Sequence, residues 1–231
     1  MQYLSGYYWR QEEAVSLVLK HLVYPGEEEP VLFGCMCQGE GGARFSRKLT
    51  DWFYREGLYF CKKTSVTAEG MQGQLKAQIG ALAQKQGHAS VKTHVQKQGC
   101  ASTQTQVQGQ QEEKTVLTGA AILCVGEDFA LWSSLGQPVY LLNTSFGRSH
   151  IRMLTDGQNE QFLCGKFQKG VGVWIPTKDL CLQMKTEELV GCLKVKDIQD
   201  EEKLGKRLRE IGTEAAKRGA EHVSTMLVMT C

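Results

Sequence analysis

The apolar positions in the first 86 residues predict two strands followed by two helices. Residues 14–23 alternate apolar and polar side chains, which predicts a strand because successive side chains of a strand lie on opposite faces. After a turn that contains two prolines, the apolar run at 31–37 predicts the partner strand. Apolar residues then recur at helical spacing over 43–55, before a C-capping Gly57, and again over about 69–86, so we expect two helices there.

The second half of the chain predicts strands at short, even spacing and then helices. The expected elements are strands at 118–125, 129–134, 139–143, 150–154 and 170–175, a helix with Thr186 as its N-cap, a helix around 204–215 that ends at Gly219, and a closing strand at 224–229. Because short turns join the first four of these strands, we expect them to form one antiparallel meander. Strands and helices in this order predict an α+β fold in which two packed antiparallel sheets are flanked by helices.

Residues 87–114 differ in composition from the rest of the chain. They are rich in Gln, Gly, Ser, Thr and Lys and contain few large apolar residues. A segment of this kind cannot bury enough apolar surface to fold by itself. We therefore expect one domain, residues 1–231, that carries a flexible Gln-rich insertion at about 87–114, with a helical extension as the alternative.

Charge and apolar run length exclude several classes of function. The chain has 27 Lys and Arg against 25 Asp and Glu, so no basic surface is forced and nucleic acid is not an indicated partner. No apolar run approaches the roughly 20 residues of a membrane span. The N-terminal residues have neither the charged nor the apolar region of a signal peptide. We expect a cytoplasmic protein that does not bind membranes.

The nine cysteines are irregularly spaced and mostly lie in apolar surroundings. This favours free thiols that pack as small core residues in a reducing compartment. Cys35 and Cys37 would share one face of a strand, but no second cysteine pair with metal-ligand spacing accompanies them.

One segment resembles a known family. Gln38-Gly39-Glu40-Gly41-Gly42 resembles the Asp-Gly-Met-Gly-Gly element of metal-dependent, type 2C protein serine/threonine phosphatases. Segments 6–14, 118–142, 171–190 and 219–228 resemble further elements of the same family in the same order. The resemblance implies a four-layer α-β-β-α sandwich, in which two antiparallel sheets are flanked by helices.

The resemblance does not extend to the residues that bind metal ions in the family. The positions of three metal-binding aspartates of the family hold Gln38, Lys178 and His222. Two hard dications that activate water need converging carboxylates. A Lys side chain about 4 Å from such a site opposes metal binding by several kcal/mol even at an effective dielectric near 20. We therefore expect no catalytic residue, no metal ion and no other cofactor.

The function expected from this exchange is that of a pseudophosphatase. Such a protein keeps the phosphatase fold, lacks hydrolytic activity and acts as a protein-binding or regulatory module. The expected partner is a protein, such as a kinase or a phosphorylated protein, although fold analogy alone carries this expectation.

Two alternatives remain open at this point. In the first, Glu12, Glu13, Asp179 and His222 form a rebuilt site for Mn²⁺ or Mg²⁺, and the chain is a divergent metal-dependent phosphatase for phosphoserine and phosphothreonine. A one-residue shift reverses the face of a strand residue, but turns such as 177–179 do not enforce this alternation. In the second, the insertion at 87–114 has a scaffold role and the domain supports it.

Overall fold

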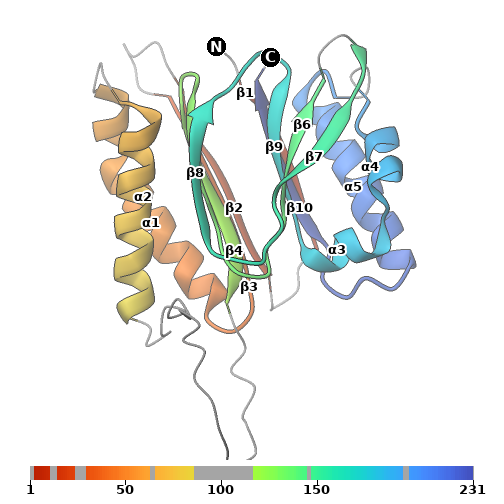
Figure 1. The fold of residues 1–231 in the computed structure, drawn as a ribbon, viewed down its shortest axis with the longest axis horizontal. Coiled ribbons are helices and arrows are strands. Elements are labelled where there is room, and N and C mark those ends of the chain that lie inside the picture. The colour runs from red at the N-terminus through yellow and green to blue at the C-terminus, as the bar shows by residue number, and fades with distance from the viewer. Residues whose placement is uncertain are drawn as a thin grey trace, which may run out of the picture.

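The protein is a sandwich of two antiparallel sheets with helices on both outer faces (Figure 1). The computed structural model describes residues 3–10, 15–23, 30–62, 66–85, 117–144, 147–194 and 198–230. This four-layer arrangement confirms the α+β sandwich expected from the sequence.

Each sheet has five strands among the described residues. The first sheet has the order β1 (Tyr3–Trp9), β10 (Ser224–Thr230), β9 (Val171–Pro176), β6 (Val139–Asn143) and β7 (His150–Thr155). The second sheet has the order β2 (Val15–Leu22), β3 (Val31–Gln38), β4 (Thr118–Val125), β5 (Asp128–Ser133) and β8 (Gln161–Lys166). All the strand pairs are antiparallel.

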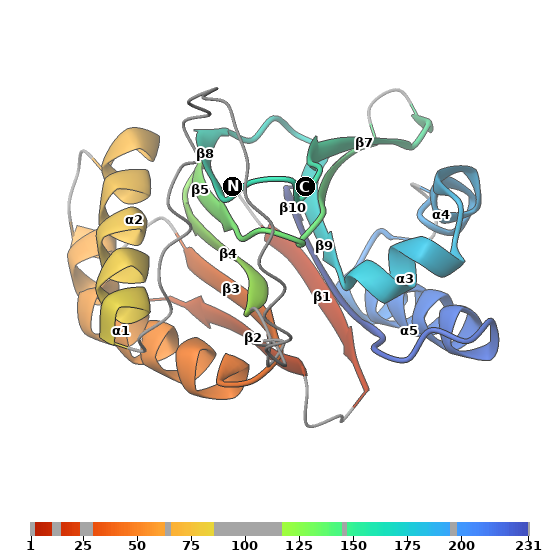
Figure 2. The same ribbon diagram turned by 60° about the horizontal axis from the view of Figure 1, so that its bottom comes forward.

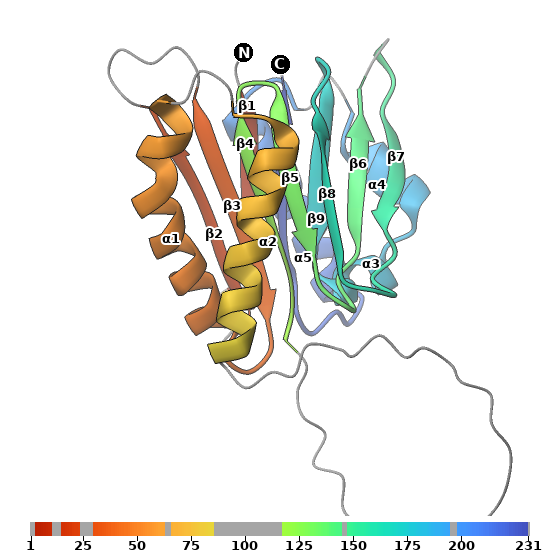
Figure 3. The same cartoon turned by 60° about the vertical axis from the view of Figure 1, so that its left-hand side comes forward.

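The helices divide between the two outer faces. The second sheet is covered by α1 (Gly42–Lys62) and α2 (Ala68–Lys85), and the first sheet by α3 (Lys178–Gln183), α4 (Thr186–Cys192) and α5 (Glu201–Lys217). Figure 3 shows α1 and α2 on the outer face of the second sheet, running roughly along its strands. None of the helices among the described residues is long and apolar enough to cross a membrane.

Burial on both faces explains the apolar run of β3. Phe33 and Cys35 face α1 and α2, whereas Leu32 and Met36 face the first sheet, and all four are at most 1% exposed. A strand covered on both sides has no polar face, so its sequence is continuously apolar. The Sγ atoms of Cys35 and Cys37 lie 3.6 Å apart in this core, where both thiols are buried and free.

The expected meander is wrong because the chain changes sheets after β5. Strands β4 and β5 pair with each other in the second sheet, whereas β6 and β7 pair in the first. The crossing passes through Gly136, whose φ of 83° suits glycine, and Pro138, which has no N–H to donate to a ladder. The place beside β5 is taken by β8, a strand that the sequence pattern did not predict; β1 was also not predicted as a strand.

The helix boundaries differ from the expected ones in three places. Helix α1 continues past Gly57 to Lys62, since one interior glycine costs only about 1 kcal/mol. Helix α3 begins where a turn was expected. The N-cap of α4 is Lys185 rather than Thr186, because the Glu188 carboxylate accepts the Lys185 N–H at 2.9 Å. The Gln-rich segment 87–114 lies outside the described residues.

Helix α5 packs closely on β1 through a glycine. A Cβ added at Gly212 would overlap the ring of Tyr8, whereas a Cβ added at Gly205, in the same helix, would meet no atom within 4 Å. The ring of Tyr8 therefore occupies the space that any other residue at position 212 would need.

This contact predicts opposite effects for the same substitution at two positions of one helix. Gly212→Ala should lower the free energy of unfolding by about 1–3 kcal/mol, because the Tyr8 ring must move. Gly205→Ala should raise it by about 0.5–1 kcal/mol, because alanine costs less backbone entropy in a helix. Urea unfolding followed by circular dichroism measures both effects, and a stabilising Gly212→Ala would contradict this packing.

Candidate functional site

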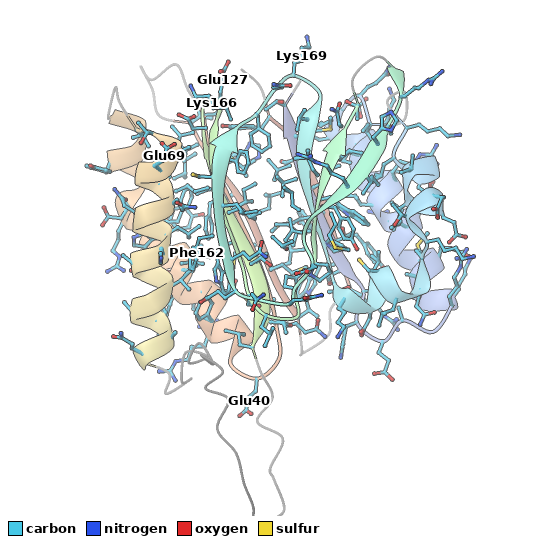
Figure 4. The ribbon with its side chains drawn as sticks, viewed as in Figure 1. Glu40, Glu69, Glu127, Phe162, Lys166 and Lys169 are labelled. Carbon is cyan, nitrogen blue, oxygen red and sulfur yellow. The ribbon has the colours of Figure 1, made fainter. Side chains whose placement is uncertain are left out.

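The segments that resemble the phosphatase metal site meet at one end of the sandwich. In the second sheet, Gln38 ends β3 beside Thr118, which begins β4. In the first sheet, β9 ends beside the start of β10. The indole N–H of Trp9 donates to Val15 O at 3.1 Å, which joins the end of β1 to the start of β2 between the sheets. Figure 2 brings this end of the molecule forward, and Figure 4 shows Glu40 projecting from it.

A glycine turn fixes the chain directly after Gln38. Gly39 and Gly41 have φ values of 99° and 78°, a region that other residues rarely adopt. The Gly42 N–H donates to Gly39 O at 3.0 Å, and the Phe45 N–H donates to Gly41 O at 2.9 Å. The turn therefore places Gln38, which is half-buried, beside the start of α1. The glycines that stood out in the sequence are required by this turn.

The other two segments are tied together by hydrogen bonds to their backbones. The Thr177 hydroxyl donates to His222 O at 2.7 Å and accepts the Ser224 N–H at 3.3 Å. The Asp179 carboxylate accepts the His222 N–H at 3.1 Å. Thr177 is fully buried, while Asp179 and the His222 side chain are half-buried. One carboxylate oxygen of Asp179 is thus engaged in holding the loop before β10.

Gln137 is a buried polar residue at this end that the sequence did not single out. It is 2% exposed, and its amide nitrogen donates to Pro176 O at 2.7 Å and Pro138 O at 2.9 Å. The Ser133 hydroxyl donates to Gln137 O at 2.7 Å. Gln137 therefore links β5 in one sheet to β9 in the other. The only signal for it in the sequence is its place in a Gly-Gln-Pro turn between two strands.

The side chains at the three positions that the resemblance assigns to metal ligands do not suit a pair of hard dications. Gln38 offers a neutral amide oxygen, Lys178 is an exposed cation at the start of α3, and His222 offers an imidazole. Mg²⁺ and Mn²⁺ prefer carboxylates, carbonyls and water. Within the described ranges, no group of three or more His, Cys, Asp and Glu residues could hold a metal ion.

The structure describes only two of the four residues of the alternative metal site, Asp179 and His222. The Asp179 carboxylate accepts the backbone N–H of His222, which places these two residues on neighbouring segments. Glu12 and Glu13 lie outside the described residues. Whether the four residues converge on one ion therefore stays a prediction.

Solved serine/threonine phosphatases share this architecture over their whole length. The S. agalactiae serine/threonine phosphatase has a TM-score of 0.62 and 10% identity, with 100% of each chain covered. The Mycobacterium tuberculosis phosphatase PstP/Ppp has a TM-score of 0.56 and 12% identity, covering 100% of this chain and 99% of its own. The catalytic domain of PstP in complex with two manganese ions has a TM-score of 0.55 and 13% identity, with 98% of each chain covered.

These likenesses establish the fold. No protein-family model and no curated protein sequence matches the chain. The chain has the fold of serine/threonine phosphatases, with two antiparallel sheets between helical layers.

The hydrogen bonds of Thr177 predict a structural role for its hydroxyl group. Thr177→Val keeps the shape of the side chain but removes both bonds, so the free energy of unfolding should fall by about 1–3 kcal/mol. The matched change Thr213→Val, on the exposed side of α5, should alter stability by no more than about 0.5 kcal/mol. Denaturant unfolding measures both variants, and equal effects would show that the Thr177 hydroxyl does not hold this loop.

Proposed function

We propose that this chain is a degenerate member of the metal-dependent, type 2C phosphatase family that does not hydrolyse phosphate. It acts as a pseudophosphatase, a protein-binding or regulatory module in the cytoplasm. The observation that carries the proposal is the set of side chains at the end of the sandwich, where Gln38, Lys178 and His222 replace the three metal-binding aspartates that the family resemblance implies.

Electrostatics supports an inactive site. The three exchanges remove three negative charges and add the positive charge of Lys178. Attraction to carboxylates is the main term that holds a hard dication, and a neighbouring cation opposes it. Without bound metal, the family chemistry has no ion to activate water or bind the phosphoryl oxygens.

The proposed partner is a protein. A kinase or a phosphorylated protein is the first candidate, because the solved proteins with this fold include serine/threonine phosphatases. This step is an analogy at the level of the fold. A partner bound without hydrolysis would be retained on the chain rather than released as product.

A second candidate function is a phosphatase with a rebuilt metal site. The contact between Asp179 and the backbone of His222 favours it, because these two proposed ligands lie on neighbouring segments. Here Glu12 and Glu13 would complete the site for Mn²⁺ or Mg²⁺. The engagement of Asp179 with a backbone N–H weighs against this candidate, because one of its oxygens is already used.

Metal binding separates the two candidates. The purified wild-type protein should carry no stoichiometric Mn²⁺ or Mg²⁺, and added Mn²⁺ should not raise its melting temperature. The triple variant Gln38→Asp, Lys178→Asp, His222→Asp should gain a melting temperature that rises with Mn²⁺, since an ion at 100 times its Kd adds about 2.7 kcal/mol of stability. The same positions changed to Asn restore no charge and serve as the control.

Hydrolysis is measured on the same preparations with an aryl phosphate and a phosphothreonine peptide. Manganese-dependent turnover by the wild type that is lost in Asp179→Asn would overturn the proposed function and establish the rebuilt site.

A further inference from the structure

A groove opens between the two sheets at the end opposite Gln38. It has a volume of about 660 Å³ and lies between β6 and β7 of the first sheet and β5 and β8 of the second. Its apolar lining includes Leu141, Leu154 and Leu163. Figure 4 shows Lys166 at this end of the molecule, opposite the end from which Glu40 projects.

The side chains of β7, which forms one wall of the groove, lie alternately on the two faces of the strand. His150, Arg152 and Leu154 line the groove, whereas Ile151 packs on the opposite face, against the core beneath α4 and α5. His150 and Arg152 are exposed although they lie on the face that points toward the other sheet. The second sheet therefore does not cover these two side chains.

The charged side chains that line the groove are all positive. Arg152 and Lys166 are cations, and none of the residues that line the groove is Asp or Glu. Lys166 Nζ lies 3.9 Å from the carboxylate of Asp128, so part of its charge is already balanced. Among the residues that the structure describes, the Arg152 guanidinium has neither an ion-pair nor a hydrogen-bonding partner. The uncompensated charge is thus concentrated on β7.

The outer edge of β7 is available for pairing. β7 is the last strand of its sheet and pairs only with β6, so half of its backbone groups have no strand partner within the described part of the chain (Figure 3). Helices contact both edge strands, α4 on β7 and α2 on β8, and on β8 the Gln72 side chain donates to Phe162 O at 2.8 Å. Charged side chains on an edge strand commonly prevent pairing, but Met153 on the other face of β7 is 52% exposed and offers an apolar contact.

We propose that β7 and the adjoining groove bind an extended acidic segment of a partner protein, which adds to the first sheet as a further strand. Backbone hydrogen bonds to β7 would hold the segment. Acidic side chains would lie across from His150 and Arg152, with an apolar side chain across from Leu154, because residues opposite each other on paired strands contact. This inference rests on the protein-binding part of the proposed function and identifies the chemistry of the partner.

The probe is a fluorescein-labelled peptide, Thr-Glu-Val-Glu-Val-Leu-Thr, whose two Glu and one Leu fall on one face of a strand. Fluorescence anisotropy at low salt should show saturable binding to the wild-type protein. Arg152→Glu should weaken binding at least about tenfold, and Arg152→Gln by less, because reversal adds repulsion to the lost attraction. Arg209→Glu, an equal charge change on the exposed face of α5, should leave binding unchanged.

Two altered peptides test the mode of binding. Replacing both Glu by Lys should abolish binding to the wild type and restore it to Arg152→Glu, which would also show that this variant is folded. Replacing both Val by Pro keeps the acidic charge but removes two backbone N–H groups, so binding should fall if the peptide pairs as a strand.

The proposal is overturned if the acidic peptide does not bind, if Arg152→Glu binds it as the wild type does, or if the Pro peptide binds equally well. Binding of a single-stranded oligonucleotide with the same dependence on Arg152 would also overturn it, because the groove would then recognise a polyanion. Failure of this proposal is distinguishable from failure of the proposed function: turnover of the aryl phosphate would overturn the latter and leave the peptide result standing.

Discussion

The burial of both sheets on both faces is the constraint on which the rest of this structure depends. The inner faces of the sheets cover each other, and the outer faces need helices, so the chain has to supply two helical layers. Trp174 illustrates the result on the first sheet, where it is fully buried beneath the helices and donates its indole N–H to the Thr225 hydroxyl at 2.6 Å. Phe33 and Phe53 stack with ring centroids 4.8 Å apart on the other side.

The same constraint determines where polar residues gather. Strands that are apolar on both faces leave only their ends for polar side chains, and at one end these side chains satisfy backbone groups of neighbouring loops. Thr177, Gln137 and Asp179 hold together the segments that the family resemblance places around metal ions. These hydrogen bonds join the loops at this end of the sandwich directly to one another.

The opposite end differs because the two sheets part there. His150 and Arg152 lie on the face of β7 that points toward the other sheet, and they are exposed at this edge of the first sheet. A charge removed from water needs a partner, so the Arg152 guanidinium on this inner face is compatible with the fold where water or another molecule reaches it. The two ends of one sandwich thus have opposite characters, one closed by internal hydrogen bonds and one open with uncompensated positive charge.

The sequence by itself determined the local elements and the side chains at the three positions that the resemblance assigns to metal ligands. Alternation and helical spacing predicted β2, β3, β4 and the main helices, and the glycine turn after Gln38 carried the resemblance to a phosphatase. Periodicity reports only which face of an element is covered, so it could not tell that β6 leaves the sheet of β5, or that β8 fills the vacated place. The contact of Asp179 with the loop at His222, the link made by Gln137 and the groove beside β7 were decided by tertiary structure alone. Each of them joins residues far apart in the chain, and their proximity follows from the packing of two sheets rather than from any local pattern.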